Sequence, residues 1–159
     1  MIEIIYVLKF IHVLAAGTMF GTWLSIAIFM ALAHRSHNPS VVALTARFVV
    51  SVERTVMAAA IVLLPLSGFP LATAVGLSPS DEFWIAIAVA IYVVVVLCWL
   101  GAVFIEFRVR NMTREAALNT APLPQAYARL FRFWCLLTVP ILVGMMALFA
   151  VMIWQPRLD

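Results

Sequence analysis

His12 is the residue of this chain whose chemistry contrasts most with its surroundings. It lies about eight residues into a long apolar stretch, which is about 12 Å along a helix. Ionisable side chains inside membrane segments are costly, so such a residue is a candidate for function. Three interpretations are open: a hydrogen bond to a neighbouring helix, an axial bond to the iron of a b-type haem, or a proton-relay or metal-transport role.

The residues around His12 indicate what a haem site would contain. At 100° per residue, Met19 and Trp23 fall within about 20° of the direction of His12 on a helix. Lys9 lies one turn earlier, where it can reach the headgroups or pair with a haem propionate or a quinone. No second histidine lies in a predicted span, so the further iron ligand is Met145 or Met146, unless the haem is five-coordinate or shared across a dimer. The predicted cofactor site is therefore His12, Lys9, Met19, Trp23 and Met145.

The opposite face of the same stretch carries Gly17 and Gly21 in a G-x-x-x-G spacing. Glycines at this spacing allow another helix backbone to approach closely. This face predicts a contact within the bundle, in a homodimer or in a larger membrane complex.

Two further sets of residues have side chains that could carry chemistry. Charged residues gather at the ends of the second and third apolar stretches: Glu53, Arg54, Glu106, Arg108 and Arg110. They predict interhelical ion pairs, with an anionic-lipid headgroup site as the alternative. The eight methionines could serve Cu(I), but none is three or four residues from another, so they are predicted to be packing residues. Hydrolase and ATPase motifs do not occur.

The elements that position these residues are membrane spans. Of the 159 residues, 66% are hydrophobic and 11% charged, and the mean hydropathy is +1.13. The net charge of +3 comes mainly from arginines at the ends of apolar runs, which is atypical of nucleic-acid binding. A helix needs about 20 apolar residues to cross the hydrocarbon core. We predict an all-α, four-transmembrane-helix bundle in one integral membrane domain, with short connections and spans at about 4–33, 55–74, 83–107 and 131–154.

Several signals predict where the helices begin and end. Asn38 can cap a second helix that starts at Pro39 and is amphipathic before it enters the lipid. The run 67–70, Ser-Gly-Phe-Pro, predicts a kink or the end of that helix, and 111–125 is predicted to be a polar connection.

Basic residues predict the orientation. Eight arginines fall at one side of the predicted bundle, whereas Lys9 and Arg157 lie at the other. The positive-inside rule then places both termini outside, in the periplasm of a bacterium, and the chain in the inner membrane.

The motifs Leu8-Lys9-Phe10-Ile11-His12, Gly17, Gly21, Trp23, Leu64-Pro65-Leu66-Ser67-Gly68, Trp99 and 149–156 together resemble a family of predicted four-span bacterial integral membrane proteins of uncharacterised function. The chain is also distantly similar to the membrane domain of copper resistance protein D and to HemJ-type protoporphyrinogen oxidase. That similarity implies haem b on His12. The oxidases also carry a lysine in a later span, which is missing here and argues against protoporphyrinogen oxidation.

Three functions are compatible with these features. The first is a b-haem-associated redox or accessory protein that exchanges electrons with a quinone or a respiratory partner. The second is a non-catalytic assembly or stability subunit of a larger membrane complex. The third is a copper or small-solute permease.

Overall fold

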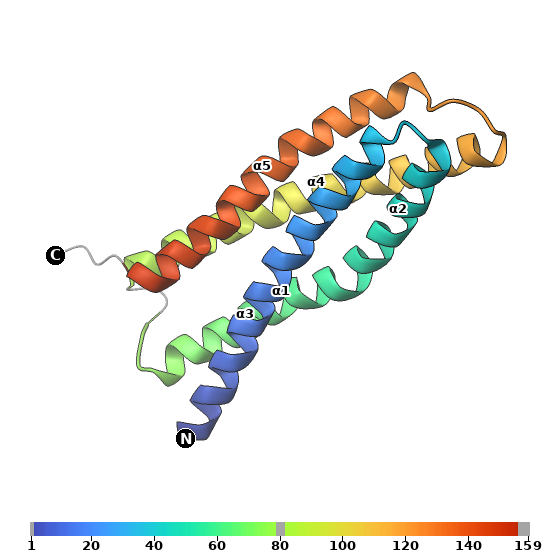
Figure 1. Cartoon of the computed structure of the whole chain (residues 1–159). Coiled ribbons are helices and arrows are strands. Elements are labelled where there is room, and N and C mark those ends of the chain that lie inside the picture. Colours follow the sequence, from blue (N-terminus) through green and yellow to red (C-terminus); the bar gives the residue numbers. More distant parts are fainter. Residues whose placement is uncertain (1, 79–81, 156–159) are drawn as a thin grey trace.

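The computed structural model describes residues 2–78 and 82–155 and contains only helices within them. The elements are α1 (Ile2–Arg35), α2 (Pro39–Val52), η1 (Glu53–Met57), α3 (Ala58–Ala74), α4 (Phe83–Leu118) and α5 (Gln125–Trp154). Because α2, η1 and α3 form one continuous rod, there are four helical rods, each long and apolar enough to cross a membrane. The predicted all-α bundle of four spans is confirmed (Figure 1).

The helices are longer than the apolar runs that define the predicted spans. α4 continues to Leu118 rather than ending near 107, and α5 begins at Gln125 rather than near 131. The polar connection predicted for 111–125 is therefore mostly helical, and only 119–124 link the two helices. Apolar length measures the part of a helix within the hydrocarbon, and backbone hydrogen bonds can continue the same helix into the headgroup region.

The start of α2 has the predicted capping arrangement. The side-chain oxygen of Asn38 accepts a hydrogen bond from the backbone N–H of Ser40 at 2.9 Å. Pro39 occupies the first helical position, where its missing N–H leaves no hydrogen bond unmade.

α3 continues through both of its prolines to Ala74, so of the kink or helix end predicted for 67–70, the helix end is wrong. Pro65 has no N–H to donate to the carbonyl of Ile61, four residues earlier. The hydroxyl of Tyr92 on α4 donates to that carbonyl at 2.7 Å. The neighbouring helix α4 thus supplies a hydrogen-bond donor to the carbonyl that Pro65 leaves unpaired. Lipid could not supply such a donor.

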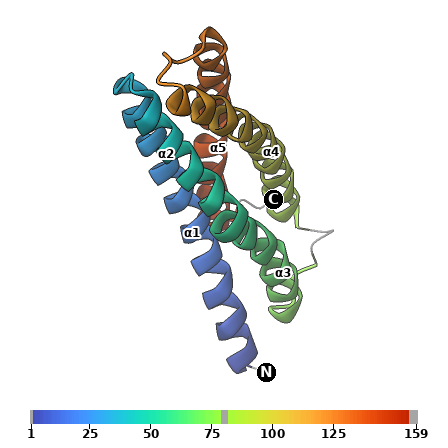
Figure 2. The same ribbon diagram turned by 90° about the vertical axis from the view of Figure 1, so that its right-hand side faces the viewer.

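The rods pack against each other in their order along the chain. α1 packs mainly against α3, α4 against α5, and α2 against α4. The α1–α2 and α4–α5 connections lie at the same end of the bundle, and the N-terminus lies at the other end (Figures 1 and 2). Large apolar side chains are exposed along all four rods, as expected for surfaces in contact with lipid.

The core between the rods combines apolar, sulfur-containing and ionisable side chains. The largest fully buried side chains include Trp23, Met30, Met57, Ile141 and Met145. The prediction that methionines serve as packing residues is confirmed for the three in this set. Glu53 and Glu106 are equally buried, at 1% and 0% exposed.

Candidate functional site

His12 lies between α1 and α3, half-buried. Its Nδ1 is 3.1 Å from the carbonyl oxygen of Leu64 and 3.1 Å from the hydroxyl oxygen of Ser67. Ser67 donates its own hydroxyl hydrogen to the carbonyl of Leu63 at 2.6 Å. Both neighbours of Nδ1 therefore act as acceptors, so the hydrogen of a neutral imidazole sits on Nδ1 and the lone pair on Nε2.

Gly68 leaves room for the imidazole of His12 to pack against α3. A Cβ atom at this position would lie 2.9 Å from Cε1 and 3.3 Å from Nδ1 of His12. Any larger residue would push the ring away from Leu64 and Ser67. The small residue and the two acceptors together hold one orientation of the histidine.

The other residues predicted for the His12 site lie in two different environments. Met19, Trp23 and Met145 are buried in the main core of the bundle, at 2%, 0% and 1% exposed, and Lys9 is exposed on α1. The hydrogen bonds of His12 run to α3 instead. Sequence spacing alone could not identify α3 as the partner, because it does not give the register between two helices.

Glu53 and Glu106 form a second polar site, which the sequence analysis did not foresee. Trp99 donates its indole N–H to Oε2 of Glu53, and Trp134 donates to Oε1 of Glu106 at 2.8 Å. We call these four residues the Glu–Trp cluster. The predicted ion pairs with nearby arginines are wrong for both glutamates, because within the described residues their polar partners are indoles. The signal for these bonds in the sequence was that Trp99 and Trp134 lie near the predicted membrane depth of Glu53 and Glu106.

The Glu–Trp cluster has unused hydrogen-bonding capacity. Oε1 of Glu53, Oε2 of Glu106 and Nε1 of Trp23 are buried and have no hydrogen-bond partner among residues 2–78 and 82–155. The ring of Trp23 lies 6.1 Å from that of Trp134. Two buried carboxylates without a cation are very unfavourable, so the cluster holds at least one neutral carboxylic acid.

A local change of helix type accompanies Glu53. The segment η1 is a π-helix, with a wider turn than the α-helices on either side. Within it, Glu53 and Met57 are both buried. Single π-turns inside membrane or soluble helices frequently occur at functional sites.

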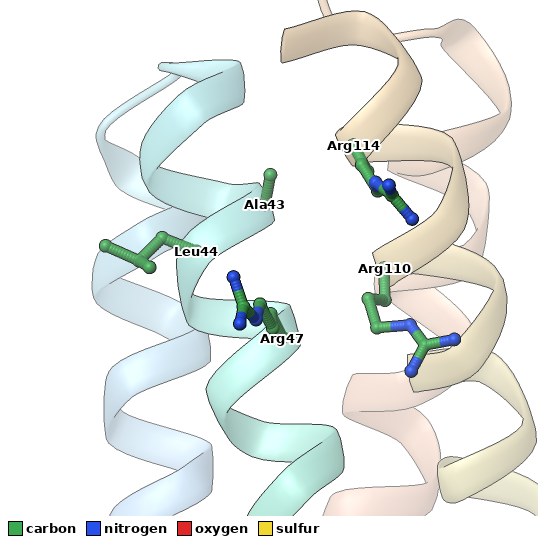
Figure 3. A pocket seen from close by; sticks show the side chains of 5 residues that line it. All are labelled: Ala43, Leu44, Arg47, Arg110 and Arg114. Carbon is green, nitrogen blue, oxygen red and sulfur yellow. The ribbon is translucent and has the colours of Figure 1, made fainter. Parts of the chain in front are cut away.

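A third site is a cavity of about 620 Å³ between α2 and α4, lined by Ala43, Leu44, Arg47, Arg110 and Arg114. We call it the Arg cavity. Arg47 extends from α2 and the other two arginines from α4, at the borders of the same gap (Figure 3). Within residues 2–78 and 82–155, no group of three or more His, Cys, Asp or Glu side chains is arranged to hold a metal ion.

Comparison with known protein families assigns the chain to one of them. Residues 6–156 match the family described as predicted integral membrane protein (DUF2269). The chain belongs to this family. Membership establishes a multi-pass integral membrane protein in contact with the lipid bilayer, and the match covers all four helical rods. No curated protein and no solved structure matches the chain. The similarity to copper resistance protein D and to HemJ-type oxidase therefore stays a prediction.

Proposed function

We propose that this DUF2269 protein is a b-haem-associated redox or accessory protein of the bacterial inner membrane, with both termini in the periplasm. It exchanges electrons with a quinone or a respiratory partner. The observation that carries the proposal is the hydrogen bonding of His12: Nδ1–H faces the carbonyl of Leu64, which leaves Nε2 as a free ligand nitrogen. Histidines that bind metals are commonly fixed by such a bond from their other nitrogen.

One residue, His12, supplies the ligand nitrogen that a haem iron needs. Neutral imidazole is the usual protein ligand of haem iron, and a haem held by Nε2 supplies one-electron chemistry. Leu64 and Ser67 fix the tautomer, and Gly68 allows the ring to approach α3. Lys9, exposed one turn before His12, would pair with a propionate or a quinone headgroup. Met145 is packed in the core, so the proposal uses His12 as the one protein ligand of the iron.

The test is an absorption spectrum of protein expressed with sufficient haem. A Soret band is expected in the wild type and in His37→Ala, which changes an exposed histidine. The band is expected to disappear in His12→Ala and in His12→Asn. The asparagine N–H can still donate to Leu64, so this variant removes the ligand nitrogen while keeping the hydrogen bond. A colourless wild type, or a band that persists in His12→Asn, refutes the proposal.

A second candidate function is a non-catalytic subunit of a larger membrane complex, including a homodimer. A groove of about 420 Å³ on α1 is lined by Phe10, Val13, Leu14, Gly17 and Thr18. A Cβ atom at Gly17 or Gly21 would meet nothing within 4 Å, so neither glycine is needed for packing within the described chain. The groove fits a transmembrane helix of a second copy or a partner subunit.

Replacement of Gly17, the glycine that lines this groove, tests the second candidate function. Gly17→Leu is expected to abolish co-purification of a partner or the crosslinked dimer in native membranes, while the protein still folds. Ala59→Leu, an exposed small-to-large change on α3, is the matched control and is expected to have no effect. Isolation of the wild type as a monomer without partners, directly from native membranes, contradicts this function.

A further inference from the structure

Three arginines border the Arg cavity, Arg47 on the α2 side and Arg110 and Arg114 on the α4 side (Figure 3). Among the described residues, no carboxylate is paired with any of them, and Arg47 and Arg114 make no hydrogen bond through their side chains. The two nearest buried acids, Glu53 and Glu106, are bonded to tryptophans instead. Three like charges around one hollow repel each other, and an anion in the hollow relieves that repulsion.

Arg110 is already oriented within the Arg cavity. Its Nε and Nη2 donate to the side-chain oxygen of Asn111 at 3.2 and 3.1 Å. Its guanidinium carbon also lies 5.1 Å from the ring centre of Phe107. The helical spacing places Arg114 one turn further along the same face of α4. A guanidinium held in this way binds phosphate with less loss of side-chain freedom, and its planar fork matches phosphate oxygens.

We propose that the Arg cavity binds the phosphate headgroup of an anionic phospholipid. Its volume is within the range of small-molecule sites. The cavity lies at the end of the bundle that carries the α1–α2 and α4–α5 connections, where the apolar part of α4 gives way to arginines. Basic hollows between transmembrane helices at this depth are suited to anionic headgroups.

The apolar residues beside the Arg cavity favour a lipid over a soluble anion. Leu44 lines the cavity and is 70% exposed, and Phe48 is 62% exposed one turn further along α2, towards the middle of the rod. Both are large apolar side chains exposed on α2 close to the cavity along the chain. They provide a surface for acyl chains, which a soluble phosphate ester does not have.

Native mass spectrometry of the whole chain in detergent tests the proposal by titration with phosphatidylglycerol. The double variant Arg47→Gln/Arg114→Gln is expected to bind this lipid about 25-fold more weakly, from about fivefold for each arginine. Both arginines are exposed, so the fold is expected to persist. The control Arg129→Gln/Arg132→Gln removes the same charge from exposed positions on α5 and is expected to change the affinity by less than about twofold.

Two further titrations separate a specific site from other sources of binding. Phosphatidylcholine, which is zwitterionic, and glycerol phosphate, which lacks acyl chains, are both expected to bind at least about tenfold more weakly than phosphatidylglycerol. Equal losses in the two double variants show only general attraction to a basic surface and overturn the proposal. Binding of glycerol phosphate as tight as that of the lipid also overturns it, in favour of a soluble anion.

Discussion

Replacement of Glu106 by glutamine is expected to change the free energy of unfolding by less than about 1 kcal/mol. Glutamine has the shape of a neutral carboxylic acid, and its oxygen can accept the hydrogen bond that Trp134 donates at 2.8 Å. Glu106 is fully buried, and no cation contacts it within the described chain. The neutral form is therefore the one that glutamine reproduces.

Replacement of Glu106 by alanine is expected to cost about 2–4 kcal/mol. Loss of the one buried methylene group, Cγ, contributes about 0.8 kcal/mol, and an indole N–H of Trp134 left without an acceptor contributes about 1–3 kcal/mol. If Glu106 were instead half of a buried ion pair, its neutralisation to glutamine alone would cost about 3–5 kcal/mol. The glutamine variant thus distinguishes a neutral acid from an ion pair, and the alanine variant shows that the assay detects a loss at this position.

Equilibrium unfolding in mixed micelles, induced by SDS and followed by circular dichroism, measures both changes. Tryptophan fluorescence is unsuitable because Trp134 is itself a partner of the altered group. Glu115→Gln, on an exposed part of α4, is the matched control and is expected to have no measurable effect. A loss for Glu106→Gln as large as that for Glu106→Ala refutes the assignment of a neutral carboxyl group.

Three other predictions use the same unfolding measurement. Gly68→Ala is expected to lower the free energy of unfolding by about 1–3 kcal/mol, because the added Cβ would lie 2.9 Å from the ring of His12. Gly17→Ala, whose Cβ would meet nothing within 4 Å, is expected to change it by at most about 0.5 kcal/mol. Equal losses in the two variants would contradict this packing. Tyr92→Phe is expected to cost about 0.6–2 kcal/mol by leaving a backbone carbonyl unpaired, and no loss would mean that another donor reaches it. Asn38→Ala is expected to cost about 1 kcal/mol, with Asn38→Ser near neutral; equal losses would argue against capping.

The sequence was sufficient to predict the four spans because the hydrocarbon thickness fixes a minimum apolar length. The Asn38 cap was also predictable, since capping depends on neighbours in the chain. The ends of α4 and α5 were not, because a helix can continue after its apolar face ends. Continuation of α3 through Pro65 depended on a hydroxyl from another rod, which local sequence does not reveal.

Prediction of the sites failed where it required the register between helices. His12 was identified from its own depth, but its partners on α3 were not. For Glu53 and Glu106, nearby arginines along the chain suggested ion pairs. In the structure the arginines border a cavity or the surface, whereas the glutamates turn inward to indole donors. Burial of a charge pair is costly, and a neutral acid with an indole partner avoids that cost.

Polar contacts between helices are especially important for the arrangement of the rods in this bundle. Apolar side chains contact lipid as favourably as they contact each other, so apolar packing alone defines the neighbours of a helix poorly. Among the described residues, each of four neighbouring pairs of rods has at least one polar contact: His12 with Ser67, Tyr92 with Ile61 and Glu53 with Trp99, Glu106 with Trp134, and His34 with Tyr127. The candidates for chemistry therefore also fix the register of the rods. A variant that removes one of these side chains can lose activity through either role, so the variants that separate the roles are those that keep the hydrogen bond, such as His12→Asn and Glu106→Gln.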